Sequence, residues 1–327
     1  MGMADTVTKQ YMRENIVFAD AFNFLLYDGE NVIRPDKLKE LDTTELAVPF
    51  TVDNTDNRHA EAVQKYRDIL KMTTIMTDDT AAYVLLGVES QTDIHYAMPV
   101  RNIIYDALQY GKQVTEISAR NRKKSKQTRR EFLSGFHRDD KLIPVITLVI
   151  HFGADKWDAP MSLHEMMAVT DKNLLKHIPD YRIKLIDPSQ ISSDEMDKFQ
   201  TSLREVLCYI KYSKNADKFA QYMKNNKRME QLELNAAQVI REVTNTKFQI
   251  PKGTEVVNVC EAVEVLMERR KNEGIQQGLE QGKSQGITQG KLSLLQDLIN
   301  DGTLTIEAAA AKADMTVEEF TESIKKL

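Results

Sequence analysis

The sequence predicts an α/β (α+β) core in its N-terminal part, followed by a C-terminal α-helical region and a glycine-periodic tail. Apolar segments of strand length occur in the first 190 residues, whereas helical patterns follow one another from Ser192 onward. The tail then carries a glycine at every fourth position. We therefore expect three parts, at residues 1–190, 191–272 and 273–327.

The composition favours a soluble globular protein, since 42% of the 327 residues are hydrophobic and 28% are charged. The longest apolar run, 142–152, has about half of the roughly 20 residues that a membrane helix needs. The N-terminus lacks an apolar core of the signal-peptide kind, so we expect a cytoplasmic protein with no membrane segment. Cys208 and Cys260 lie in helical patterns, which predicts small buried side chains rather than a disulfide.

Two neighbouring strands form the centre of the expected core. They cover 62–76 and 81–91, and the polar stretch 77–80 between them is typical of a turn. The second strand is apolar from Tyr83 to Val88, as expected of a buried central strand. The other elements of the core are helices at 12–27 and 98–113 and strands at 142–152 and 181–186.

The region after Ser192 is expected to be helical throughout. Pro251 and Gly253 mark a loop before its last helix. The predicted helices cover 193–213, 215–228, 229–245 and 255–273.

The tail presents a repeat whose role stays open between two alternatives. Each glycine costs about 1 kcal/mol relative to alanine within a helix, so an isolated helix should be weak here. A four-residue period also drifts by about 40° per repeat around a helix, so no straight contact face is maintained. The segment is either a tether with loose self-association or the seam of a specific homo-oligomer. The repeated glycines are Gly274, Gly278, Gly282, Gly286 and Gly290.

Two or three short helices are expected after the glycine repeat. Thr305 or Thr316 would cap one of them. A helix-turn-helix module is an alternative, but the second helix lacks the basic residues that such a module uses to contact DNA.

The sequence lacks several familiar catalytic motifs. It contains no HExxH, CxxC or GxSxG pattern, and its six histidines show no metal-ligand spacing. Gly282-Lys283-Ser284 resembles the end of a phosphate-binding loop, but Gln277 stands where that loop needs a glycine.

The two predicted strands at 62–76 and 81–91 carry the candidate residues of a functional site. Glu89 and Gln91 are two residues apart, so they share one face of a strand. Glu89 ends an apolar run, where a buried carboxylate needs a partner or a cation. Asp68 is the only acid between Glu61 and Asp78.

Antiparallel pairing about the turn at 77–80 places Asp68 roughly opposite Glu89. Two carboxylates brought together repel each other, and a divalent cation would relieve that repulsion. Hard oxygen ligands suit magnesium, which keeps several waters available for chemistry. The alternative is that each acid is paired with an arginine, for which Arg67 and Arg101 are the candidates.

A basic run at 117–130 follows the helix after the second strand and contains no acid. It is either a solvated helix face or a patch that contacts phosphates, and the second interpretation depends on a nuclease site nearby. Its cations are Arg120, Arg122, Lys123, Lys124, Lys126, Arg129 and Arg130.

The order of these motifs resembles the recombination-promoting nuclease/putative transposase family of the PD-(D/E)XK nuclease superfamily. The similarity spans most of the chain, and the glycine-periodic tail also looks like that of the family. Each motif is loose by itself, whereas their order and spacing together are fairly specific. The matching pieces are Phe18-Ala19-Asp20-Ala21-Phe22-Asn23, Tyr66-Arg67-Asp68, Leu85-Leu86-Gly87-Val88-Glu89-Ser90-Gln91, Met98-Pro99-Val100-Arg101 with Tyr105 and Tyr110, and Ile186-Asp187-Pro188.

The resemblance implies a PD-(D/E)XK nuclease-like αβββαβ core and Mg²⁺-dependent hydrolysis of a DNA phosphodiester, with Mn²⁺ as a substitute. It carries Asp68 and Glu89 over as metal ligands. It makes Gln91 a further catalytic residue at the position where the superfamily often has lysine. Asp20, on the first helix, would be an accessory acid.

Two departures from the superfamily pattern change the expected chemistry. No proline precedes Asp68, and Gln91 carries no positive charge. Gln91 can therefore orient a water or a phosphate but cannot stabilise hydroxide electrostatically, so activation of water would fall mainly to the metal. We expect Arg101 and the basic run to bind DNA phosphates without sequence specificity.

The sequence therefore predicts a metal-dependent DNA endonuclease. One rival is a DNA-binding protein whose catalytic site has decayed, which the neutral Gln91 favours. The other rival is a helical assembly protein that forms homo-oligomers through the tail.

Overall fold

The chain forms two compact units, residues 1–262 and residues 263–327. The computed structural model describes residues 2–41, 44–47, 63–66, 68–77, 80–123 and 128–325. For strand residues 44–47, 63–66, 75–77, 80–83, 85 and 89 it describes the backbone alone. The predicted division at residues 190 and 272 stays a prediction.

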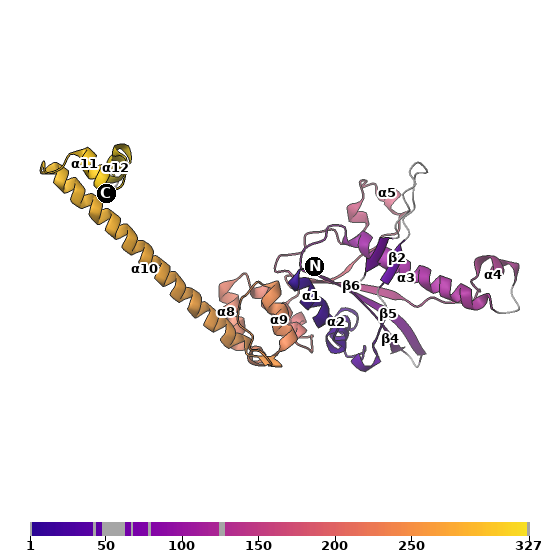
Figure 1. The fold of residues 1–327 in the computed structure, drawn as a ribbon. Coiled ribbons are helices and arrows are strands. Elements are labelled where there is room, and N and C mark those ends of the chain that lie inside the picture. The colour runs from indigo at the N-terminus through magenta and orange to yellow at the C-terminus, as the bar shows by residue number, and fades with distance from the viewer. Residues whose placement is uncertain are drawn as a thin grey trace. The chain divides into compact units, whose positions relative to one another are not determined.

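A five-stranded mixed sheet forms the centre of the first unit (Figure 1). The first three strands in spatial order are antiparallel to their neighbours, and the last three are parallel. This confirms the predicted combination of a central sheet with many helices. In spatial order the strands are β1 (Lys39–Glu40), β4 (Ile69–Thr77), β5 (Thr80–Gln91), β6 (Val145–His151) and β7 (Lys184–Ile186).

The described residues of this unit also form two small two-stranded ladders. β2 (Thr44–Ala47) pairs with β3 (Val63–Tyr66), and β8 (Leu232–Glu233) pairs with β9 (Val256–Val257).

The predicted hairpin is present as β4 and β5, which are antiparallel from Ile69 opposite Val88 to Thr77 opposite Thr80. Leu86 and Val88 are fully buried, as expected of a central strand. The predicted strand at 62–76 is divided in the structure, because its first part pairs with β2 and its second part forms β4.

Helices α2 (Asn15–Tyr27) and α3 (Met98–Asn121) cover opposite faces of the sheet. Side chains alternate along a strand, so neighbouring residues of β4 report on the two faces. Lys71 points to α2, where its Nζ donates to Asn15 Oδ1 at 2.7 Å and lies 4.8 Å from the centre of the Phe18 ring. Leu70 packs on the other face with Tyr110 of α3.

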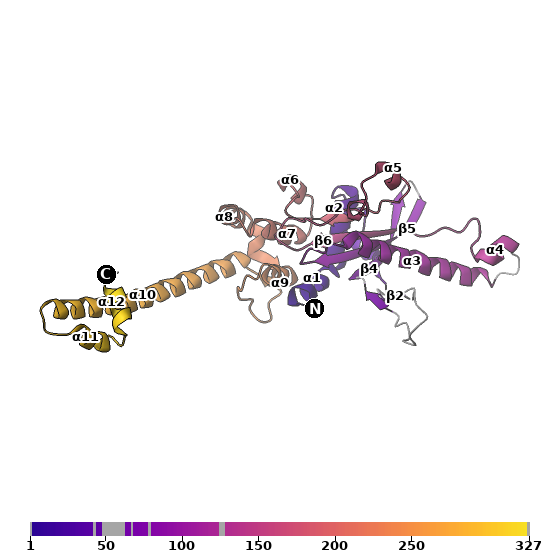
Figure 2. The ribbon, with the colours of Figure 1, turned by 90° about the horizontal axis from the view of Figure 1, so that it is seen from above.

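Helix α3 packs along β6, and Figure 2 shows the two elements side by side. Hydrogen bonds that link α3 to β6 and to Tyr181 stabilise this packing. Asp106 of α3 accepts hydrogen bonds from Thr147 Oγ1 at 2.6 Å and from Tyr181 Oη at 2.7 Å. Tyr110 Oη accepts from the backbone N–H of Val145 at 3.1 Å. These contacts fix the helix that carries Arg101.

The predicted helix at 12–27 is wrong at its start. Residues before it form a separate helix, α1 (Met3–Met12), and the chain turns at Arg13 and Glu14 before α2 begins. Lys71 of β4 also donates a hydrogen bond to the Arg13 carbonyl, so a side chain of the sheet pairs with a backbone acceptor in the turn between the two helices. Tyr11 and Met12 are buried, and α1 packs against the later helix α9 (Leu234–Val243).

Residues 191–262 of the predicted helical region belong to the first unit, and the bounds of the helices predicted there need correction. The expected helix at 193–213 is two helices, α6 (Ser193–Met196) and α7 (Leu203–Tyr212). The expected helix at 215–228 ends earlier, as α8 (Ala216–Asn225), and a 3₁₀ turn at Lys227–Gln231 follows it. The described residues of this unit also form the short helices α4 (Arg129–Ser134) and α5 (Lys172–Leu175) and 3₁₀ turns at Pro35–Lys37 and His164–Met166.

The glycine repeat lies within one continuous helix, α10 (Val259–Asn300), where the sequence predicts only a weak one. A Cβ atom built on any of the five repeat glycines meets no other described atom within 4 Å. The repeat therefore has no packing partner in the part of the chain that the structure describes.

The second unit ends in two short helices, α11 (Ile306–Lys312) and α12 (Val317–Ile324). They bury Ala309, Ala310 and Phe320 against Leu292 and Leu295 of α10. Both predicted caps are confirmed. Ala308 N donates to Thr305 Oγ1 at 3.3 Å, and Glu319 N donates to Thr316 Oγ1 at 3.2 Å. Across the described residues, no helix has both the length and the apolar character needed to cross a membrane.

Candidate active site

Asp68 stands directly before the first residue of β4. The register of the hairpin pairs Ile69 with Val88, and continuing it by one position brings Asp68 opposite Glu89. The backbone thus has the relationship predicted from the turn. The side chain of Glu89 lies outside the described atoms, so the predicted contact between the two carboxylates stays a prediction.

The Asp68 carboxylate is held between the strand edge and a lysine. Its Oδ2 accepts a hydrogen bond from the backbone N–H of Ser90 at 2.8 Å, and its Oδ1 lies 3.0 Å from Lys9 Nζ. The side chain is only 5% exposed. Burial raises the pKa of the Asp68 carboxyl above its ordinary value, and it outweighs the opposite effects of the Ser90 hydrogen bond and of the Lys9 and Arg101 charges.

Lys9 reaches this carboxylate from α1 and is the site residue that sequence reasoning missed. It also pairs with Asp5 at 3.1 Å, one helical turn before it. Burial lowers the pKa of Lys9, but the ion pairs with Asp68 and Asp5 together outweigh that effect and raise it. The four-residue spacing of Asp5 and Lys9 was the only local signal, and it does not reveal the contact with Asp68.

A cavity of about 480 Å³ collects the candidate residues at the end of β5. Asp68, Gln91 and Arg101 all line it, so the structure brings three of the predicted site residues together. Gln91 Nε2 donates to the Ser90 carbonyl at 3.3 Å, and Arg101 Nε donates to Tyr105 Oη at 3.2 Å. Strand ends supply the acid and the amide, and the first turns of α3 supply the guanidinium.

Asp20 does not belong to this group. Its buried carboxylate accepts hydrogen bonds from the backbone N–H groups of Gln200 and Thr201, at 2.9 Å each, and from Thr201 Oγ1 at 2.6 Å. It is not among the residues that line the cavity. This placement gives Asp20 a structural role between α2 and the start of α7, and it does not support the predicted role of an accessory acid.

The basic run extends away from the cavity along α3. Arg101 lies in the first turn of this helix and Arg120 in the last. At 1.5 Å per residue, the two positions are about 28 Å apart along the helix axis. Arg122 and Lys123 follow the helix and are exposed, whereas the predicted residues Lys124 and Lys126 lie outside the described part of the chain.

The cavity beside Asp68 contains hard oxygen donors of the kind that magnesium prefers. Asp5, Asp93 and the Gln91 amide line the same cavity as Asp68. The Lys9 ammonium at Asp68 Oδ1 shows that the carboxylate accepts a positive charge at this point. Among the described residues no group of three or more His, Cys, Asp or Glu side chains is placed to hold a metal, and the Glu89 side chain is outside that search. The residues present fit a cation held by few protein ligands and several waters.

The histidines and cysteines offer no competing centre among the described residues. His151 Nε2 lies 3.0 Å from the Asp155 carbonyl, and His164 Nε2 lies 2.7 Å from the Ile178 carbonyl. Cys208 and Cys260 are free thiols; Cys208 is buried, as predicted, whereas Cys260 is only partly buried. Burial raises the pKa of Cys208 to about 11.

Residues 59–240 match the model of the family described as "Putative transposase, YhgA-like". The chain belongs to this family. The matched part of this YhgA-like chain contains Asp68, Gln91, Arg101 and all of α3, whereas α1 with Lys9 and α2 with Asp20 precede it. No curated protein and no solved structure matches the chain.

Proposed function

We propose that this YhgA-like protein cleaves DNA phosphodiester bonds in a metal-dependent reaction at the Asp68 cavity, and that it promotes recombination by doing so. Membership of a family described by transposition supports a role in DNA rearrangement. The observation that carries the proposal is the convergence of a buried carboxylate, an amide and a guanidinium in one cavity, formed by Asp68, Gln91 and Arg101.

Each residue has a role that its surroundings support. Asp68 is oriented by the Ser90 N–H, which leaves Oδ1 turned toward the Lys9 ammonium. Asp68, together with Glu89, would hold a magnesium ion. Such an ion, when bound, lowers the pKa of a water ligand and neutralises the phosphate charge.

The neutral and cationic side chains act on the substrate. Gln91 offers an amide that can orient a water or a phosphate oxygen, but it adds no charge. Arg101 offers a planar guanidinium suited to two phosphate oxygens, and it is steadied by Tyr105. The exposed cations at the end of α3 would contact phosphates farther along the duplex.

Incubation of the full chain with supercoiled plasmid tests the proposal. We expect nicking with Mg²⁺ or Mn²⁺ and none with a chelator. Asp68→Asn, which keeps the shape of the side chain, should lose more than about 100-fold in cleavage rate while DNA binding is retained. Asp217→Asn, an exposed position in α8, is the matched control and should cleave normally. Normal cleavage by Asp68→Asn would refute the assignment of the site.

A second candidate function is DNA binding without cleavage. The ion pair between Lys9 and Asp68 favours it, because the carboxylate already has a cationic partner within the chain. The neutral Gln91 favours it as well. Duplex binding combined with no cleavage under any metal condition would establish this candidate and exclude the nuclease.

A further inference from the structure

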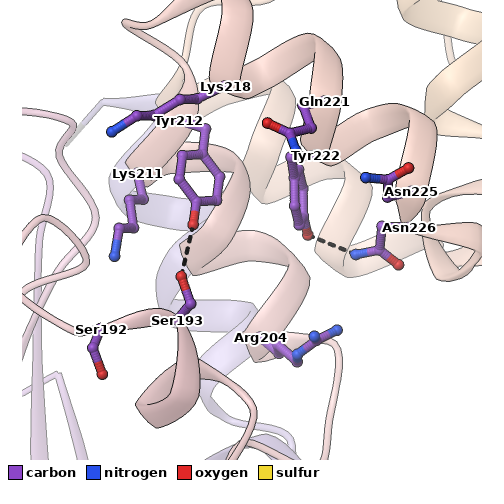
Figure 3. A pocket seen from close by; sticks show the side chains of 10 residues that line it. All are labelled: Ser192, Ser193, Arg204, Lys211, Tyr212, Lys218, Gln221, Tyr222, Asn225 and Asn226. Atoms are coloured by element: carbon purple, nitrogen blue, oxygen red, sulfur yellow. Dashed lines mark hydrogen bonds between the residues drawn. The ribbon is translucent and has the colours of Figure 1, made fainter.

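A second cavity, of about 660 Å³, lies among the helices of the C-terminal part of the first unit (Figure 3). Side chains from the start of α6, from α7 and from α8 surround it. Three of the lining side chains are cations, namely Arg204, Lys211 and Lys218. No Asp, Glu, His or Cys is among the described residues that line it. This composition fits a binding site for an anion.

The three cations differ in how their charge is compensated. Arg204 is held by Asp197, with Nε 3.1 Å from Oδ1, and by the fully buried Glu205, with Nη1 3.0 Å from Oε1. Lys211 Nζ donates to the backbone carbonyl of Ile191 and lies 5.7 Å from the centre of the Tyr212 ring, and none of the described acids pairs with it. Lys218 has neither an ion pair nor a hydrogen bond through its side chain to any other described residue. The cavity therefore has a rigid guanidinium and two ammonium groups available to a ligand.

Neutral groups give the cavity a second character. The rings of Tyr212 and Tyr222 both line the cavity and lie 5.4 Å apart between centroids, and we call this pair the tyrosine wall. Figure 3 shows the amides of Gln221 and Asn225 beside this wall. Aromatic faces stack against nucleobases, and amides both donate and accept hydrogen bonds at base edges.

We propose that this cavity binds a nucleotide, with its phosphate at Lys218 and Lys211 and its base against the tyrosine wall. The volume is in the range of small-molecule sites, which is about 300–1,000 Å³. The same chemistry is presented by a free mononucleotide and by one unit of a single DNA strand. The proposal does not depend on cleavage at Asp68, because the two cavities share no lining residue.

Calorimetric titration of the full chain, with a chelator present to prevent cleavage, tests this site. The probes are thymidine 5′-monophosphate, inorganic phosphate, thymidine and a short oligothymidylate. We expect the mononucleotide to bind more tightly than either phosphate or thymidine alone. Lys218→Ala should weaken mononucleotide binding at least about fivefold, as expected for loss of one charge-assisted hydrogen bond.

Lys224→Ala is the matched control, since Lys224 is exposed on the same helix and does not line the cavity. Both lysines are exposed, so neither change threatens the fold. An oligothymidylate that binds more tightly than the mononucleotide, and loses that advantage in Lys218→Ala, would identify a DNA strand as the ligand. Equal binding of the two would identify the free nucleotide. Phosphate binding as tight as mononucleotide binding, no binding of either nucleotide probe, or equal losses in the two lysine variants would overturn the proposal.

Discussion

Lys9 Nζ lies 3.0 Å from Asp68 Oδ1, so a residue of the first helix neutralises the carboxylate that precedes the central hairpin. A metal ion bound at Asp68 would have to compete with this ammonium. The contact therefore links the N-terminal helix to the proposed chemistry, although that helix precedes the part of the chain that matches the family.

Removing the Lys9 charge should strengthen metal binding. We expect Lys9→Met to lower the half-saturating Mn²⁺ concentration at least about fivefold, since loss of even about 1 kcal/mol of like-charge repulsion has that effect. Lys9→Arg keeps the charge and should bind Mn²⁺ as the unchanged protein does. Calorimetric titration measures both, and identical affinities in Lys9→Met and the unchanged protein would show that Lys9 does not compete.

Asp20→Ala should destabilise the protein without a specific effect on cleavage. The change leaves the backbone N–H groups of Gln200 and Thr201 without their buried acceptor, at a cost of about 2–4 kcal/mol in the free energy of unfolding. Urea unfolding followed by circular dichroism measures this loss. Asp28→Asn, at the exposed end of α2, is the control and should cost less than about 1 kcal/mol, because asparagine also tolerates the left-handed backbone at this position. A fully stable Asp20→Ala protein that no longer cleaves DNA would instead restore the predicted accessory acid.

The contribution of Asp187 to the free energy of unfolding should depend on pH in the acidic range. Burial alone would raise the pKa of Asp187, but hydrogen bonds from Gln190 and from the backbone N–H groups of Trp157 and Ser189 hold it below its ordinary value of 3.8. A carboxylate with a depressed pKa stabilises the fold above pH 3.8 and loses that contribution as pH falls through its folded-state pKa.

We therefore expect Asp187→Asn to be less stable than the unchanged protein at neutral pH. The difference between the two in free energy of unfolding should shrink as the pH falls below 3.8. Denaturant unfolding over a range of pH measures it. A difference that stays constant into acid would show that ionisation of Asp187 does not contribute.

The cations at the end of α3 should contribute to DNA affinity through phosphates. Replacing Arg120, Arg122 and Lys123 by alanine should reduce the slope of log affinity against log salt by about 0.9 for each phosphate that the protein no longer neutralises. Fluorescence anisotropy with duplexes of different sequence should show the same reduction for each. Lys252→Ala, an exposed change in a loop, is the control and should leave the slope unchanged. An unchanged slope in the triple variant would mean that this end of α3 is only a solvated face.

Gly282→Ala should distinguish the two roles left open for the tail. Within one molecule the added methyl group meets no described atom within 4 Å, so helix stability should rise by about 1 kcal/mol. Thermal melting by circular dichroism would record this gain. If α10 instead associates with a second copy through its glycines, the methyl group would obstruct the approach, and sedimentation would show weaker self-association.

The sequence by itself determined the central hairpin and the alignment of Asp68 with Glu89. Both depend on a local turn and on alternation along two neighbouring strands, so they can be inferred from residues close together in the chain. The helix that carries Arg101 and the threonine caps of the last helices are local in the same sense.

Only the tertiary structure decided which side chains meet from distant parts of the chain. Lys9 approaches Asp68 because α1 packs against the sheet and against α9, and nothing near Lys9 in the sequence records that packing. Asp20 lies outside the site because its carboxylate pairs with the backbone N–H groups of Gln200 and Thr201. These two residues lie in the break that divides the helix predicted at 193–213. Local patterns determine which elements form, whereas the partners of a buried charge depend on burial and hydrogen bonding that only the packed structure establishes.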